Sequence, residues 1–128
     1  MSDRVQPVTS SNLPSPVGPY SPGVVVGNLV FVSGQAGREP GSGRLAPDVE
    51  AQTEQVLKNI ATILEAAGSG LQHVVRCGVW LDDPRDFWSF NAVYKSYFGD
   101  HPPARACVQS HMMVDCKVEI DCVAYKGP

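Results

Sequence analysis

Arginine, cysteine and glutamate near the C-terminus are the residues whose types and spacing could form a reactive site. Arg105 and Cys107 lie in one run of alternating residues, and Glu119 lies in a second run after a short loop. Side chains alternate across a strand, so pairing of the two runs around Met113 or Val114 would place all three on one face. A one-residue slip in this pairing would put them on opposite faces.

An arginine and a glutamate on one face could bind and convert an anionic substrate. A planar guanidinium can bind both oxygens of a carboxylate, and a nearby glutamate can act as a general acid or base. The alternative is a solvated strand face, on which such an ion pair contributes only about 0–1 kcal/mol. Spacing alone leaves both interpretations open. A nucleophilic Cys107 with a histidine base is a third interpretation, which no sequence signature supports.

Two other residues stand out locally. Asn91 shares the inward face of a predicted helix with Phe87 and Tyr94, where an amide without a hydrogen bond costs about 1–3 kcal/mol. We therefore expect Asn91 to hold a neighbouring loop by its backbone rather than to contact substrate. Tyr20 lies in a turn between two prolines, where a tyrosine more commonly serves packing.

Composition and charge narrow the class of protein. The chain has 128 residues, enough for one domain, and a net charge of −3, without the basic footprint of a nucleic-acid binder. No apolar run is long enough to span a membrane, and the N-terminus lacks the apolar region of a signal peptide. We therefore expect a cytoplasmic protein whose cysteines are reduced thiols. Neither histidine nor cysteine spacing predicts a metal site.

Other segments must position these residues. Apolar residues recur at the period of a strand in some segments and at the period of a helix in others, and their order predicts an α+β fold, β-β-α-β-α-β-β. Residues 1–15 are expected to form a flexible arm, and residues 16–128 a single domain. The strands are predicted over residues 24–26, 29–35, 74–81, 104–110 and 116–125. The helices are predicted over residues 48–67 and 83–98, each with an aspartate cap at its start.

Several motifs, in order along nearly the whole chain, resemble the RidA family, also called YjgF or L-PSP. They are GPYSPG at 18–23, FVSGQ at 31–35, Gln52-Thr53, NAVY at 91–94, PARACV at 103–108 and VEI at 118–120. The resemblance implies a chorismate-mutase-like fold, in which a mixed sheet carries two helices on one face. It also implies a homotrimer around a central barrel, with pockets in the clefts between subunits.

The resemblance further implies hydrolytic deamination of reactive enamines and imines, such as 2-aminoacrylate and 2-iminobutanoate, to 2-oxo acids and ammonia. These compounds are products of pyridoxal-phosphate enzymes, and the hydrolysis needs no cofactor or metal. Carried over to this sequence, Arg105 would bind the substrate carboxylate, and Glu119 would activate the attacking water. The residues that would line or support the pocket are Tyr20, Ser33, Gly34, Asn91 and Cys107.

Other functions stay open at the level of sequence. The segments 36–38, 98–103 and 111–115 depart from the usual family pattern, which leaves the particular substrate undecided. An aminomuconate-like ring-fission acid is one alternative substrate. A non-catalytic trimer that binds carboxylate metabolites is an alternative from another class. The endoribonuclease label that the family has carried fits poorly with the negative net charge.

Overall fold

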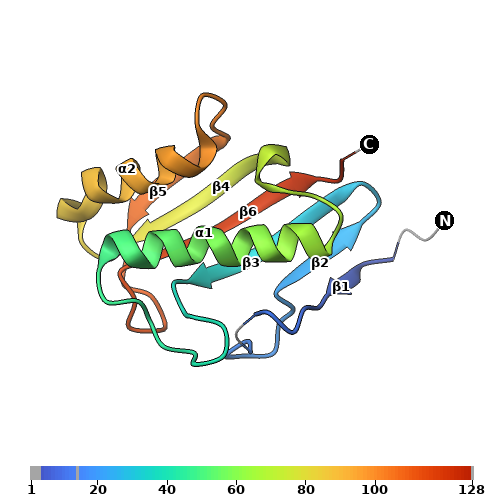
Figure 1. Ribbon diagram of the computed structural model, residues 1–128, viewed down its shortest axis with the longest axis horizontal. Helices are drawn as coiled ribbons and strands as arrows, with labels where there is room; N and C mark the ends of the chain where they lie inside the picture. The colour runs from blue at the N-terminus through green and yellow to red at the C-terminus, as the bar shows by residue number, and fades with distance from the viewer. Residues whose placement is uncertain (1–3, 14, 128) are drawn as a thin grey trace.

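A six-stranded sheet with two α-helices on one face forms the molecule (Figure 1). The computed structural model describes residues 4–13 and 15–127. The strands are β1 (Gln6–Val8), β2 (Gly23–Val26), β3 (Leu29–Ala36), β4 (Val74–Leu81), β5 (Ala104–Gln109) and β6 (Val118–Tyr125). The helices are α1 (Val49–Ala66) and α2 (Phe87–Phe98). The short 3-10 turn η1 (Leu71–His73) lies between α1 and β4, and η2 (Pro84–Asp86) directly precedes α2. The predicted α+β architecture, with a mixed sheet and two helices on one face, is confirmed.

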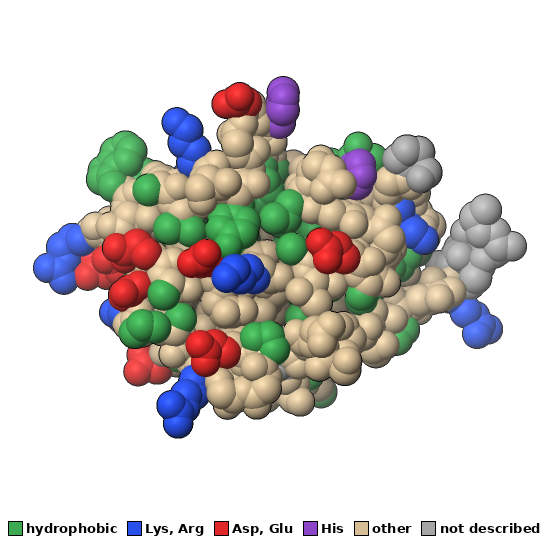
Figure 2. Space-filling view, viewed as in Figure 1, with side chains coloured by type: hydrophobic (Ala, Val, Ile, Leu, Met, Phe, Trp, Pro, Cys, Tyr) green, Lys and Arg blue, Asp and Glu red, His purple; other side chains and the backbone are tan. Residues whose placement is uncertain are grey.

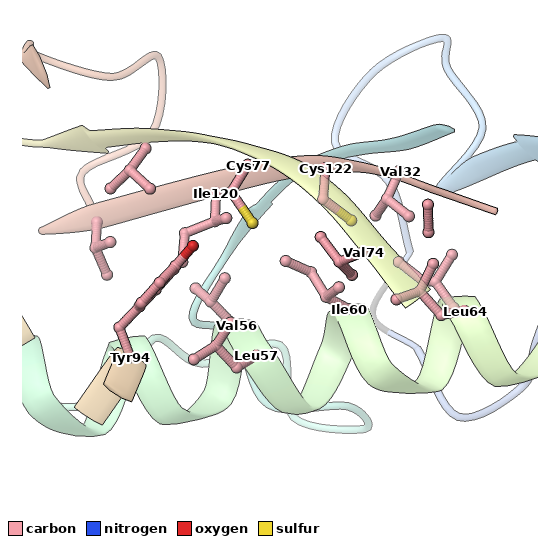
Figure 3. Close-up of a cluster of buried hydrophobic side chains, with 14 of the residues drawn as sticks. Val32, Val56, Leu57, Ile60, Leu64, Val74, Cys77, Tyr94, Ile120 and Cys122 are labelled. Carbon is pink, nitrogen blue, oxygen red and sulfur yellow. The ribbon is translucent and has the colours of Figure 1, made fainter. Parts of the chain in front are cut away.

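Helix α1 covers the centre of the sheet because its apolar residues recur at the helical period. Its N-cap is Asp48, whose carboxylate accepts a 2.8 Å hydrogen bond from the Ala51 N–H. Gly68 follows its end with a φ of +83°, a conformation that suits glycine. Side chains from α1 and the sheet interlock in the core that Figure 3 shows, which includes Val32, Val56, Leu57, Ile60, Leu64, Ile120 and Cys122.

Part of the segment that was expected to form an N-terminal arm is a strand, over Gln6–Val8. This segment is β1, which pairs antiparallel with β2 and places Val8 opposite Gly23. Val8 is only 5% exposed, because its side chain packs into the core. The burial of an apolar side chain therefore holds a segment whose composition suggests a loose terminus. Residues 1–3 and 14 lie outside the described residues.

The order of the strands differs from the hairpin expected for β5 and β6. The sheet order is β1-β2-β3-β6-β4-β5, so β6 lies between β3 and β4 and does not pair with β5. Helix α2 carries the chain across the sheet between β4 and β5, and such a crossover joins parallel strands. The segment between β5 and β6 then passes the end of β4, and β6 runs antiparallel to both of its neighbours.

Two buried amides of α1 hold the loops around one end of the sheet. Gln52 donates to the Ala46 carbonyl at 2.9 Å and accepts from the Lys117 N–H at 2.8 Å. Asn59 donates to the Arg38 carbonyl at 2.9 Å. The support of a loop backbone, which the sequence analysis expected of Asn91, is thus provided by Gln52 and Asn59. Neither α-helix has the length and apolarity needed to cross a bilayer, among the residues that the structure describes.

Replacement of Gln52 by leucine should lower the free energy of unfolding by about 2–4 kcal/mol. The leucine leaves the part-buried Ala46 carbonyl and Lys117 N–H without their partners, and an unsatisfied polar group costs about 1–3 kcal/mol. Urea denaturation at a fixed chain concentration measures the change. Gln72→Leu makes the same chemical change at an exposed position and should be nearly neutral. Equal stability of the two variants would contradict this role of Gln52.

Candidate active site

Arg105 and Glu119 lie on opposite faces of the sheet. In the strand register, Arg105 of β5 is opposite Cys77 of β4, and Glu119 of β6 is opposite Trp80. Cys77 and Trp80 are three residues apart on one strand and therefore point to opposite faces. The expectation that Arg105, Cys107 and Glu119 share one face is wrong, because β4 separates the two strands that were expected to pair.

A pocket of about 490 Å³ contains Glu119 and three other residues that the sequence analysis selected. These are Tyr20, Ser33 and Gly34, which the structure brings together with Glu119 although they come from distant parts of the chain. The side of the pocket formed by β4 and the segment before β6 includes Trp80, Met112, Met113 and Val114. The pocket therefore combines one carboxyl group with a lining of both apolar and polar residues, Arg38 among them.

A β-bulge in β3 shapes the floor of this pocket. The register between β3 and β6 shifts between Val32 and Gln35, so that Ser33 and Gly34 together occupy the place opposite Asp121. A Cβ atom on Gly34 would overlap the Glu119 carboxyl group, so a larger residue here would displace that carboxyl group. The Ser33 hydroxyl donates to the Ser21 carbonyl at 2.6 Å and thereby ties the bulge to the Tyr20 turn.

The environment of Glu119 makes the ionised form of its carboxyl group less favourable than it is in water. Burial, followed by the negative charge of Asp121, raises the pKa of the Glu119 carboxyl above its ordinary value. No hydrogen bond from the described residues stabilises its ionised form. A carboxyl group with a raised pKa can both accept a proton from water and return one to a leaving group.

Arg105 is held on the other face by neutral groups of α2. Its guanidinium carbon lies 4.8 Å from the ring centroid of Tyr94, 5.3 Å from that of Phe90 and 5.8 Å from that of Phe87. One guanidinium N–H donates to the Asn91 side-chain oxygen at 2.7 Å. No carboxylate in the described part of the chain forms an ion pair with Arg105. Its positive charge is therefore oriented but not neutralised, which suits an anionic ligand.

Cys107 shares the helix-side face of β5 with Arg105 but is a poor candidate for a nucleophile. Burial raises the pKa of its thiol, and the positive charge of Arg105 offsets only part of this increase. A reactive cysteine requires a lowered pKa, because the thiolate is the nucleophile. Within residues 4–13 and 15–127, no three His, Cys, Asp or Glu side chains are grouped so as to hold a metal ion.

The sequence analysis missed Trp80 and the segment 110–114 as parts of the pocket. Trp80 alternates with Val79 and Leu81 in a strand that was predicted correctly, so the parity of that strand could have placed it on the outer face. The segment 110–114 offers no such signal, because its place depends on the order of the strands.

Comparisons with known proteins find similarity to one family over most of the chain. The family model described as "Endoribonuclease L-PSP" matches residues 10–126. The 2-iminobutanoate/2-iminopropanoate deaminase of Mus musculus is 40% identical, across 94% of this chain and 91% of the relative. The deaminase of the same name from Salmonella typhimurium is 38% identical, across 93% of this chain and 96% of the relative.

Solved structures show the same fold. RidA from the Antarctic bacterium Psychrobacter sp. has a TM-score of 0.90 and 40% sequence identity, covering 94% of this chain and 98% of that chain. The TdcF protein of E. coli, whose structure was solved with bound serine, has a TM-score of 0.91 and 34% identity, covering 95% of this chain and 99% of that chain.

Proposed function

From the premise that this chain belongs to the endoribonuclease L-PSP family, which includes the RidA proteins, we propose that it deaminates reactive enamines and imines. The substrates are of the 2-aminoacrylate or 2-iminobutanoate type, and the products are a 2-oxo acid and ammonia. The names of the deaminase relatives support this class of reaction. The raised pKa of Glu119, in a pocket that has room for a small acid, is the observation that carries the proposal.

We place the active site between neighbouring copies of the chain. Arg105 and Glu119 are on opposite faces of one sheet, so a single copy does not bring both to one substrate. Strand β5 is at the edge of the sheet, where a second copy can approach Arg105. Exposed apolar side chains on the outer face, Phe31 at 40% and Val108 at 51%, offer a surface for such contact. The homotrimer that the family resemblance implies satisfies this requirement.

In the proposed mechanism, Arg105 of one copy binds the substrate carboxylate in a bidentate pair. Glu119 of the neighbouring copy takes a proton from water, and the hydroxide oxygen bonds to the imine carbon. Glu119 then returns that proton to the nitrogen, which gives a carbinolamine. The hydroxyl proton of the carbinolamine next passes through Glu119 to the nitrogen, the carbon–nitrogen bond breaks, and ammonia leaves as the carbonyl forms. An enamine substrate first becomes the imine by protonation at carbon. One water is consumed for each ammonia released.

RNA is not part of the proposal, although the family model carries the name of an endoribonuclease. The chain has a net charge of −3, and Figure 2 shows basic side chains scattered among acidic ones on the helix-covered face. Binding to a phosphate backbone instead favours a continuous basic surface. A cytoplasmic location and a link to pyridoxal-phosphate enzymes, which would supply the substrate, stay predictions.

Glu119→Gln should lower kcat for imine hydrolysis by about 10²–10⁴-fold with little change in KM, because it removes the proton-transfer group. Arg105→Lys should mainly raise KM, because an ammonium group cannot form the bidentate pair. The assay couples a pyridoxal-phosphate threonine dehydratase, present in excess, to this protein and follows the formation of 2-oxobutanoate. If the protein binds 2-oxobutanoate but does not accelerate hydrolysis, the result would favour the metabolite-binding alternative and contradict the proposed deaminase activity.

Asn91→Asp should raise KM by about tenfold, since the new carboxylate would pair with Arg105 and compete with the substrate. The fold should persist because the side chains have nearly the same shape. Asn28→Asp adds the same charge at an exposed hairpin turn and serves as the matched control in the coupled assay. An unchanged KM for Asn91→Asp would show that Arg105 does not bind the substrate carboxylate.

A further inference from the structure

Asp121 is a charged residue beside Glu119 that the proposed mechanism does not use. The two residues are two apart on β6, so their side chains share the outer face and their Cα atoms are separated by roughly 7 Å. The bulge that brings Gly34 under Glu119 lies directly opposite Asp121. Asp121 is therefore the next carboxylate along β6 on the same face as Glu119.

The Asp121 carboxylate is fixed in place by the backbone of β4. Its Oδ1 atom accepts a 2.9 Å hydrogen bond from the Gly78 N–H. A Cβ atom on Gly78 would lie 2.5 Å from that oxygen, closer than real contacts allow. Each carboxyl group thus lies over its own glycine, Glu119 over Gly34 and Asp121 over Gly78. The hydrogen bond to the Gly78 N–H thus orients the Asp121 carboxylate toward β4.

We propose that Asp121 is a positioning residue that acts through Glu119, as a negative charge held on the same face of β6 beside the carboxyl group that transfers the proton. This inference rests on the proposed function, in which Glu119 takes a proton from water and returns it to the departing nitrogen. A carboxylate that is too acidic would accept the proton poorly in the first of these steps. In this proposal, Asp121 affects how readily Glu119 accepts and returns the proton, without contacting the substrate.

The other titratable groups around Glu119 do not provide the same effect. Those that face it from other elements are Tyr20, Arg38, His111 and Cys116. Arg38 donates to a backbone carbonyl, and His111 lies 2.8 Å from the Asp82 carboxylate. Burial and the charge of Glu119 raise the pKa of Cys116 to about 11, which keeps it neutral. Strand β4 presents Arg76, Gly78 and Trp80 to the face on which Glu119 lies, and Arg76 forms no ion pair with Asp121 among the described residues.

The test is a titration of the Glu119 side-chain carboxyl by ¹³C NMR in the assembled full-length protein, with Glu119→Gln used to assign its signal. Asp121→Asn removes the charge and keeps an oxygen that can accept from the Gly78 N–H. We expect the titration midpoint to fall by about half to one pH unit. The acid limb of the kcat/KM profile should move to lower pH by the same amount. Glu65→Gln, which removes a distant exposed charge on α1, should leave both unchanged.

The outcomes separate this inference from the proposed function. A folded Asp121→Asn protein with an unchanged Glu119 midpoint would overturn the inference. A lowered midpoint together with full activity of Glu119→Gln would support the electrostatic coupling and overturn the proposed function instead. If the asparagine variant does not fold, Asp121→Ser provides a smaller neutral acceptor on which the same midpoint is measured.

Discussion

The alternation of side chains across the sheet is the constraint on which the whole account depends. It puts Arg105 with the helices and Glu119 on the opposite face, although β4 alone separates their strands. A substrate with a carboxylate at one end and a carbon to be attacked nearby must reach both groups. One chain cannot provide this, so chemistry that uses both residues requires association of copies. Assembly is thus part of the proposed catalytic design.

Arg105 and Glu119, the two halves of the proposed site, have different surroundings. Arg105 is oriented by three aromatic rings and one amide, all neutral, so its charge remains available to an anion. Glu119 is partly buried over a glycine in a β-bulge and faces a second carboxylate, which makes it ready to hold a proton. A cation that binds and a carboxyl group that transfers protons are the two functions that imine hydrolysis needs.

Local sequence signals predicted most of the elements, and the motifs selected the candidate site residues, but neither predicted how the strands are ordered. The Asp48 cap, the helical period that follows it and Gly68 defined α1 nearly to its ends. The pairing of β5 with β4 depends on where the α2 crossover returns the chain, which no local pattern records. For the same reason the partner of Asn91 was missed: its amide meets Arg105 only in that arrangement. The strand β1 was missed because three residues are too few to show the alternation that indicates a strand.

The measurement that tests the central claim most directly is complementation between two inactive variants. Arg105→Ala and Glu119→Gln chains are unfolded, mixed in equal amounts and refolded together, and imine hydrolysis is compared with that of each variant refolded alone. If the site is shared between neighbours in a trimer, mixed assemblies regain one intact site each. Random mixing then restores about a quarter of the wild-type activity. Mixed assemblies that form, as mass spectrometry would show, but remain as inactive as the separate variants would contradict a shared site.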